Sequence, residues 1–295
     1  MAVPASRAQI RHTAVAAGLR PNGALGQYFI HDADAARRIA RILGPGRHDS
    51  VLHAGPGLGV LTMELLRRDT RVTAVELDPL LARQLSVTVA GRTRGAQARL
   101  TVLNRDVTTL CGAELPDEPT GLVVSLPHQV AVGAMLHLLA EFPSIVTVLA
   151  VLEANVADRL TGRPVELNHQ AAAVKAAYFG TVRERGAISP DAFWPTPRHP
   201  YRLIQLDRYP SCRWSPDPSW RSDVFDLVDI AYANPRRSAR TAFAQWAGSG
   251  AQAARLLLAA SINPSLAANE LKITDLVRLH QRSLHPELAS RRHQP

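Results

Sequence analysis

The sequence predicts an α/β domain with a parallel sheet, followed by a small all-helical domain. Three observations lead to this prediction. Apolar, strand-like runs alternate with helix-like segments from about residue 35, and a glycine-rich turn follows the first of these runs. Only helical patterns follow residue 224. Alternation of this kind is typical of a parallel sheet covered by helices, because parallel strands need crossover connections.

The α/β part begins with an amphipathic helix over residues 35–43. Short apolar runs then predict buried strands, whereas longer stretches with apolar residues three and four positions apart predict helices. We expect strands at residues 50–55, 71–78, 99–106, 121–126 and 144–153, and helices over residues 59–68, 78–89 and 132–142. Ligands of such sheets bind at the carboxyl ends of the strands.

A stretch rich in proline, serine and tryptophan lies between Leu206 and Phe225 and is typical of a linker. Behind it, amphipathic segments predict short helices. These segments cover residues 224–233, 238–248, 251–260 and 272–281. We therefore expect a catalytic domain over residues 1–209 and a small helical domain over residues 210–295.

The net charge of the 295-residue chain is +9, which is ordinarily typical of a protein with a polyanionic partner. Only Lys175 and Lys272 among the 34 basic residues are lysines, and the arginines are scattered along the chain. The charge alone therefore does not establish a nucleic-acid partner, because the geometry of a basic patch decides binding.

Cys111 and Cys212 are isolated and lack the spacing of a zinc site or a disulfide framework, so no metal is expected. No stretch reaches the roughly 20 apolar residues that span a bilayer, and the first residues lack the apolar core of a signal peptide. We expect a cytoplasmic protein with no membrane partner.

The turn over residues 54–59 carries Gly55, Gly57 and Gly59. Glycines at this spacing let the backbone approach a ligand at a helix N-terminus. Such a turn alone can equally serve a dinucleotide.

Two acidic residues make the pattern more specific. Glu76 lies at the end of the second strand, where a carboxylate can hold two ribose hydroxyls. Asp106 follows the third strand, where a carboxylate can accept the exocyclic amine of an adenine. Either acid alone is often only a helix cap. Together with the glycine turn, in this order, the two acids indicate an adenosine pocket.

Three further motifs complete the set: residues 26–29 read GQYF, residues 125–128 read SLPH, and residues 193–197 read FWPTP. With the glycine turn and the two acids, they resemble the ribosomal RNA adenine dimethyltransferases, both the small-subunit and the macrolide-resistance type. The resemblance covers roughly residues 24–285. It implies a Rossmann-like class I methyltransferase domain that uses S-adenosylmethionine as its cofactor.

The resemblance also assigns the parts of the pocket. The three glycines would bracket the methionine part of the cofactor, Glu76 would hold the ribose, and Asp106 would hold the adenine. The expected cofactor-binding residues are Gln27, Gly55, Gly57, Gly59, Glu76, Leu77, Asp106 and Ser125.

The chain departs from the family pattern at the pocket. Where the family has GQNF and NLPY, this chain has Tyr28 in the first motif, and Ser125 and His128 in the second. In the family, the asparagine of NLPY accepts the target amine's hydrogen, and the tyrosine of NLPY stacks on the adenine. The serine hydroxyl that replaces this asparagine lacks the paired oxygen and NH₂ of an amide. His53 replaces the glutamate that precedes the glycine turn. These changes indicate a paralogue whose reaction has changed.

Two of the departures make chemical sense together. A histidine titrates near neutrality, and a phenol beside it can relay a proton, so Tyr28 and His128 are the predicted catalytic base. A weakly acidic N–H such as that of an indole would gain from such a base. In the alternative, His128 only caps its helix and Tyr28 packs over it. The expected substrate-binding residues are Pro127, Phe193 and Trp194, with Phe193 as a wall for a flat substrate.

We therefore expect an S-adenosylmethionine-dependent methyltransferase for a small aromatic, indole-type substrate of specialised metabolism, similar to the bacterial indole carbon 3-methyltransferases. It would methylate carbon or nitrogen. One alternative is a ribosomal RNA adenine N-methyltransferase, and another is an inactive relative that docks on RNA. RNA is the less favoured partner, and the oligomeric state is open.

Overall fold

The computed structural model describes residues 7–16, 18–21, 26–44, 50–92, 95–162, 171–234 and 236–284. The chain divides into two compact units. The first comprises Met1–Ala157 and Val182–Arg208, and the second comprises Asp158–Thr181 and Tyr209–Pro295. The later boundary lies one residue before the expected one, whereas the segment Asp158–Thr181 was expected in the first domain.

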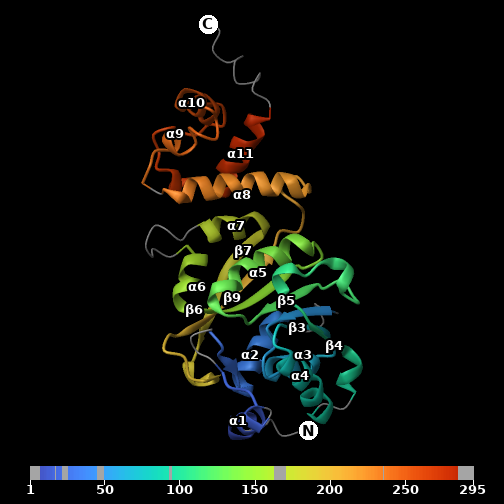
Figure 1. Cartoon of the computed structure of the whole chain (residues 1–295). Coiled ribbons are helices and arrows are strands. Elements are labelled where there is room, and N and C mark those ends of the chain that lie inside the picture. The colour runs from blue at the N-terminus through green and yellow to red at the C-terminus, as the bar shows by residue number, and fades with distance from the viewer. Residues whose placement is uncertain are drawn as a thin grey trace. The chain divides into compact units, whose positions relative to one another are not determined.

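A central sheet organises the first unit (Figure 1). Its order in the described part of the chain is β4-β3-β2-β5-β6-β9-β7, and the strands β2 to β6 run parallel to one another. The strands are β2 (Ser50–Ala54), β3 (Arg71–Glu76), β4 (Leu100–Asn104), β5 (Gly121–Val124), β6 (Thr147–Glu153), β7 (Gly180–Ile188) and β9 (Tyr201–Arg208). All five strands expected from the sequence are present.

Helices precede, connect and follow these strands along the chain. The helices are α1 (Arg7–Ala16), α2 (Ala33–Leu43), α3 (Val60–Leu66), α4 (Pro79–Arg92), α5 (His128–Glu141) and α6 (Ala154–Leu160). Short 3-10 helices lie at η2 (Ala96–Arg99), η3 (Val107–Thr109), η4 (Gly112–Glu114), η6 (Pro190–Ala192) and η7 (Ala268–Glu270). A separate two-stranded sheet pairs β1 (Phe29–Ile30) with β8 (Phe193–Trp194).

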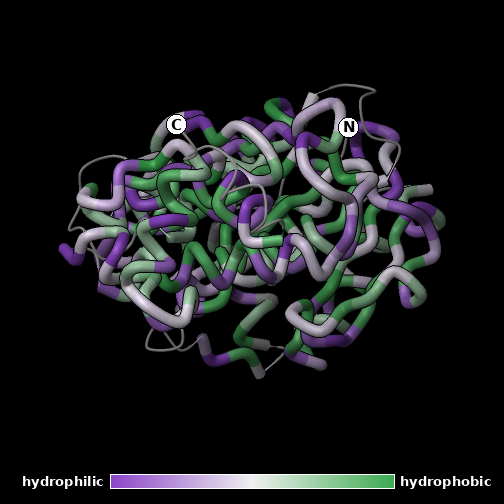
Figure 2. The backbone as a smooth tube through the Cα atoms, turned by 90° about the horizontal axis from the view of Figure 1, so that it is seen from above, coloured by the Kyte–Doolittle hydropathy of each residue, from purple (hydrophilic) through white to green (hydrophobic). Residues whose placement is uncertain are grey.

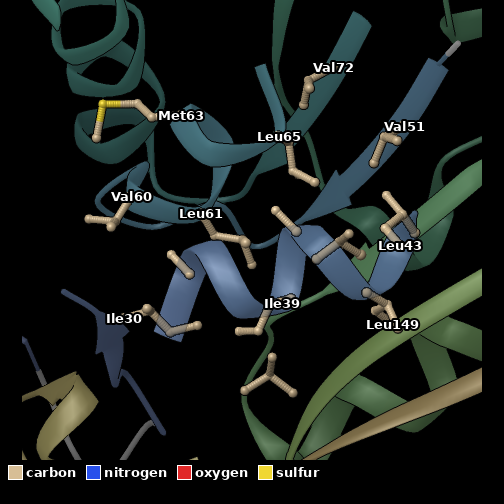
Figure 3. Packing of buried hydrophobic residues seen from close by; sticks show 14 of the residues in the cluster. Ile30, Ile39, Leu43, Val51, Val60, Leu61, Met63, Leu65, Val72 and Leu149 are labelled. Atoms are coloured by element: carbon tan, nitrogen blue, oxygen red, sulfur yellow. The ribbon is translucent and has the colours of Figure 1, made fainter. Parts of the chain in front are cut away.

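Helix α2 illustrates how the sequence builds the core. Asp32 caps its N-terminus by accepting hydrogen bonds from the amides of Asp34 and Ala35, each 2.9 Å long, and a cap of this kind contributes about 0.5–2 kcal/mol. Its buried residues recur at helical spacing and are Ala36, Ile39, Ala40 and Leu43. Figure 3 shows α2 and α3 side chains pointing toward each other and toward Val51 and Leu149 of the sheet. Burial of this apolar face therefore fixes α2 against the sheet.

The strands of the sheet differ in burial, and therefore in how clearly their sequences predict a strand. Strands β2, β5 and β6 are buried along their whole length, as expected for strands covered on both faces. In Figure 2 the hydrophobic stretches lie mostly inside and the hydrophilic ones in outer turns. Strand β9 instead alternates buried and half-exposed residues and pairs antiparallel with β6. The sequence analysis predicted only strands that are continuous apolar runs. It therefore did not predict β9, whose apolar run is interrupted, or β7.

Helices and one aromatic cluster make up the second unit. The helices are α7 (Ala171–Phe179), α8 (Pro218–Ala233), α9 (Ala239–Ala242), α10 (Gly250–Ala259) and α11 (Ile273–Ser283). The rings of Tyr178, Phe179 and Phe225 meet edge to face with centroids 5.5–6.0 Å apart. The indole N–H of Trp214 donates to the Tyr178 carbonyl at 3.2 Å. The stretch expected as a linker thus contributes to packing. In the described ranges, no helix is long and apolar enough to span a membrane.

Arg208 contacts three carbonyl oxygens in one stretch of the first unit. Its guanidinium donates to the carbonyl oxygens of Leu139 (2.5 Å), Phe142 (3.3 Å) and Ile145 (2.6 Å). These carbonyls lie at and after the C-terminus of α5, where a helix leaves its last carbonyls without intrahelical donors. The last residue of β9 therefore satisfies the turn that leads from α5 into β6.

We predict that Arg208→Lys lowers the free energy of unfolding by about 1–3 kcal/mol, because one ammonium cannot reach three carbonyls and leaves acceptors unpaired. Urea denaturation would show a lower midpoint with an unchanged slope. Arg183→Lys is the matched control, because the Arg183–Asp207 pair is largely exposed and should be worth less than about 1 kcal/mol. Equal midpoints for Arg208→Lys and the wild type would contradict this role.

Candidate active site

A cavity of about 860 Å³ lies in the first unit at the carboxyl ends of the parallel strands. This is the edge at which open α/β sheets bind ligands. Nine of the expected site residues line it: Gln27, Tyr28, Gly55, Gly57, Glu76, Leu77, Asp106, Ser125 and Pro127. Strand ends far apart in the sequence therefore converge on one space, as the alternating pattern predicted.

Four expected site residues are not among the residues that line this cavity: Gly59, His128, Phe193 and Trp194. Phe193 is 2% exposed, and its ring centroid lies 4.5 Å from that of Tyr201. Trp194 packs near a small apolar cluster of Ala14 and Leu81. Both aromatic side chains thus contribute to the framework behind the cavity rather than to its wall.

The glycine turn needs glycine at each of its three positions. Gly55, Gly57 and Gly59 have φ of 74°, 53° and 80°, in the left-handed region that side chains disfavour. A Cβ on Gly55 would lie 2.4 Å from the Ser125 carbonyl oxygen, and one on Gly59 would lie 2.5 Å from Leu85. Gly59 therefore serves the packing of α3 on α4, whereas Gly55 allows the turn to approach the Ser125 backbone and Gly57 allows it to approach Phe29.

The Glu76 carboxylate joins the glycine turn to the end of β3 at the cavity. Its carboxylate accepts hydrogen bonds from the backbone amides of Gly57 (3.2 Å) and Asp78 (3.1 Å). Burial raises the pKa of Glu76, while these two hydrogen bonds act in the opposite direction. Asn104 fixes the same strand end by donating to the carbonyls of Glu76 and Leu77 at 2.8 and 2.9 Å. A pre-positioned carboxylate with remaining lone pairs can accept hydroxyl hydrogens of a ligand.

Asp106 is exposed and caps η3. It accepts hydrogen bonds from the backbone amide of Thr108 at 2.9 Å and from its hydroxyl at 2.7 Å. These bonds lower the pKa of Asp106, so the side chain is anionic at neutral pH. Asp106 is therefore a helix cap that also lines the cavity, and the two roles do not exclude each other.

The segment 26–30 borders the cavity on another side. Phe29 and Ile30 pair with Trp194 and Phe193, which brings the GQYF and FWPTP motifs together. Gly26 lies close to Pro127 of the SLPH motif, where an added Cβ would come within 2.9 Å of the Pro127 Cβ. Three motifs from distant parts of the chain therefore meet here.

A series of side-chain contacts joins Tyr28 to His128. The rings of Tyr28 and Tyr201 meet edge to face with centroids 6.4 Å apart, and the Tyr201 hydroxyl donates to Glu153 at 3.5 Å. Glu153 Oε1 lies 3.1 Å from Nδ1 of His128, within ion-pair distance but without forming a hydrogen bond. Burial, then the neighbouring Glu153 and Tyr28, raise the pKa of Tyr201. The Tyr201 hydroxyl therefore stays protonated and available as a donor.

Sequence reasoning missed Glu153 and Tyr201. They face each other in the antiparallel register of β6 and β9. The signal was an acid at the end of an apolar strand, the same signal that identified Glu76. Tyr28 and His128 are therefore linked indirectly, through the contacts that Tyr201 and Glu153 make with them and with each other.

His53 lies in β2, fully buried, and lines the cavity. Its Nδ1 lies 2.9 Å from the Thr62 hydroxyl. Burial lowers the pKa of His53 to about 3, so the ring is neutral at physiological pH. Within the described ranges, no cluster of three or more histidine, cysteine or acidic side chains could hold a metal ion.

These features fit an adenosine-containing cofactor. The cavity is large enough for one, since small-molecule sites span roughly 300–1,000 Å³. The glycine turn leaves backbone exposed at its wall, and a fixed carboxylate, Glu76, lies 19 positions beyond Gly57 at the end of the next strand. Exposed apolar side chains of Leu77, Leu80 and Val130 border the cavity and offer a surface for flat rings.

Comparison with known proteins adds independent information. A family model described as ribosomal RNA adenine dimethylase matches residues 18–279. A protein named ribosomal RNA small subunit methyltransferase A from Mycobacterium sp. (strain KMS) is 50% identical over 277 residues, covering 94% of each chain. The crystal structure of the 23S rRNA methyltransferase ErmE covers 86% of this chain and 98% of its own, with a TM-score of 0.61 and 22% identity. A dimethyladenosine transferase from Plasmodium falciparum covers 84% and 93%, with a TM-score of 0.64 and 14% identity.

These findings correct the expected substrate. The prediction of a small aromatic, indole-type substrate and of a role in specialised metabolism is wrong, because relatives that share half of the residues are named for ribosomal RNA. The substitutions at Tyr28, Ser125 and His128 do not outweigh a similarity that extends over nearly the whole chain. The disfavoured partner, RNA, is the one that the relatives support.

The fold, the cofactor and the enzyme class agree across sequence, structure and relatives. The first unit is a Rossmann-like class I methyltransferase domain, and the two solved structures have the same fold. The protein is an S-adenosylmethionine-dependent methyltransferase. Since the family model covers most of its length, the chain belongs to the ribosomal RNA adenine dimethylase family.

Proposed function

We propose that this enzyme methylates the exocyclic amine of adenine in the RNA of the small ribosomal subunit. The observation that carries the proposal is the 50% identity, over 94% of both chains, to a small-subunit ribosomal RNA methyltransferase. The cavity at the sheet edge supports it, because its apolar border suits a flat base that has been turned out of an RNA. We further propose that the enzyme works in the cytoplasm, where it meets ribosomal RNA.

The cofactor side of the site follows from the strand ends. Glu76 would accept hydrogen bonds from the ribose hydroxyls, and Asp106 would accept one from the adenine amine. The turn at Gly55 and Gly57 would hold the methionine part, with Gln27 and Leu77 closing over the cofactor. Bound S-adenosylmethionine supplies an electrophilic methyl group on a sulfonium centre.

The protein's own contribution is positioning and removal of a proton. The amine of adenine must approach the methyl group in line, and effective positioning lowers the barrier of such a displacement. The Ser125 hydroxyl would accept one amine hydrogen, and Pro127 would lie beneath the base. After transfer the amine carries one proton too many, and a nearby acceptor must take it.

We propose Tyr28 and His128 as the groups that orient the amine and accept this proton. Tyr28 lines the cavity, and Pro127 and Gln129, on either side of His128, line it too. Glu153 would act as a positioning residue, because its carboxylate lies 3.1 Å from Nδ1 of the His128 ring and can fix the ring's orientation. The contacts through Tyr201 would tie the two groups into one unit.

Glu76 should give cofactor binding a distinctive pH dependence. Burial raises the pKa of Glu76, and only the ionised carboxylate can accept both ribose hydrogens. The affinity for S-adenosylhomocysteine should therefore increase as the pH rises through that pKa. Glu76→Gln should bind about tenfold more weakly and lose this pH dependence, as calorimetry from mildly acidic to neutral pH would show. Asp106→Asn is the control, since the pKa of Asp106 is lowered and its pH step falls in more acidic solution. An unchanged pH dependence in Glu76→Gln would exclude the ribose contact.

The substrate can be tested with labelled cofactor. Small ribosomal subunits from a strain that lacks adenine dimethylation should accept methyl groups, and digestion followed by mass spectrometry should find them on the adenine amine. A Glu76→Ala protein is the control for non-enzymatic labelling. If the wild type binds S-adenosylhomocysteine but leaves the RNA unlabelled, the proposed substrate is wrong.

The proton path predicts linked effects on the rate. His128→Ala and Tyr28→Phe should each lower kcat by about 10²–10⁴-fold while leaving cofactor affinity nearly intact. Their effects should not add in the double variant, because either change already breaks the unit. Glu153→Gln should lower kcat without raising KM. Tyr209→Phe is the control and should behave as the wild type, because Tyr209 is not among the residues that line the cavity. Wild-type rates in both single variants would make the pair structural.

A further inference from the structure

His53 is a polar side chain in β2, a strand that is buried along its whole length. It lies between Ala74 of β3 and Val123 of β5 and is 0% exposed. Burial of an imidazole in such surroundings is unfavourable unless both ring nitrogens find partners.

One nitrogen is partnered within the protein and the other is not. Nδ1 lies 2.9 Å from the hydroxyl of Thr62, which is itself fully buried in α3. Nε2 is buried and has no hydrogen-bond partner in the described part of the chain. The residue lines the cavity together with Gly55 and Gly57. An unpaired buried nitrogen costs about 1–3 kcal/mol, a cost that a ligand in the cavity can remove.

The contact with Thr62 determines which hydrogen His53 carries. A pKa near 3 keeps the ring neutral, so one nitrogen bears a hydrogen and the other a lone pair. If Thr62 donates to Nδ1, the hydroxyl hydrogen is satisfied and only Nε2–H lacks a partner. If Nδ1–H donated to Thr62, both the hydroxyl hydrogen and the Nε2 lone pair would lack one. The first arrangement leaves fewer buried groups unpaired, so Nε2 carries the hydrogen.

His53 lines this cavity, so its buried, unpartnered N–H can be satisfied by a hydrogen-bond acceptor of a ligand there. The glycine turn beside it is where the amino-acid end of S-adenosylmethionine would lie. Of the two charged groups at that end, the ammonium is a donor and the carboxylate is an acceptor. We infer that Nε2–H of His53 donates a hydrogen bond to the carboxylate of the cofactor and that Thr62 sets the tautomer that makes this possible.

This role concerns the cofactor alone and does not depend on which substrate the enzyme methylates. It makes a neutral side chain responsible for the carboxylate, so recognition of that group would not rely on a net charge at this position. It also gives the buried contact between β2 and α3 a purpose beyond packing.

Binding calorimetry without RNA tests the inference. His53→Leu should weaken S-adenosylhomocysteine by about ten- to hundredfold, the range for a lost hydrogen bond to a charged group. The same variant should bind decarboxylated S-adenosylmethionine, which lacks the carboxylate, as well as the wild type does. His53→Gln keeps an N–H donor and should recover most of the lost affinity. Unchanged affinity for S-adenosylhomocysteine in His53→Leu, or an equal loss for both ligands, would overturn the assignment.

The tautomer can be measured separately, which keeps the inference testable if His53→Leu fails to fold. Nitrogen NMR of the labelled wild-type protein should show hydrogen on Nε2, and the Nε2 signal should shift on addition of S-adenosylhomocysteine. Thr62→Val should release the tautomer, so that Nδ1–H becomes populated. Hydrogen on Nδ1 in the wild type would refute the donor role. Because no RNA is present, these results are independent of the proposed ribosomal substrate.

Discussion

The hydrogen bond from the Gly57 amide to the Glu76 carboxylate is the contact on which the rest of the site depends. It holds the turn after β2 against the end of β3, at the edge of the sheet where both parallel strands end. The turn can make this approach only because its glycines adopt positive φ. Once the two strand ends are fixed, the positions of Asp106 and Ser125 follow from the register of the neighbouring strands.

Much of this fold could be read from the sequence, and the reason is local. Each parallel strand is a continuous apolar run, and each crossover helix has its own periodicity, so the pattern needs no knowledge of distant contacts. Strand β9 could not be found in this way, because its position between β6 and β7 depends on pairing over a long sequence separation. The grouping of the segment Asp158–Thr181 with the second unit was not predicted for the same reason, since its own sequence does not indicate which core it contacts.

The site likewise contains residues whose positions local sequence predicts and residues whose positions depend on distant contacts. Residues at the ends of predicted strands, such as Glu76 and Asp106, line the cavity as expected. Phe193 was assigned from a motif, yet its side chain is buried against Tyr201, because a motif fixes a position in the chain but not the direction of a side chain. The proximity of Glu153 and His128 was not predictable, since it arises where the end of β6 meets the start of α5 in space.

The pairing of β1 with β8 has a consequence for the order of folding. Ile30 meets Phe193 across more than half of the chain's length. Closing so large a loop is entropically costly until the intervening strands have already brought its ends together. The strand ends of β2 to β5 can therefore assemble first, from contacts between near neighbours in sequence, and the segment that borders the cavity is added last. During synthesis, the strand ends of β2 to β5 that line the cavity would therefore assemble before the residues of β8 have left the ribosome.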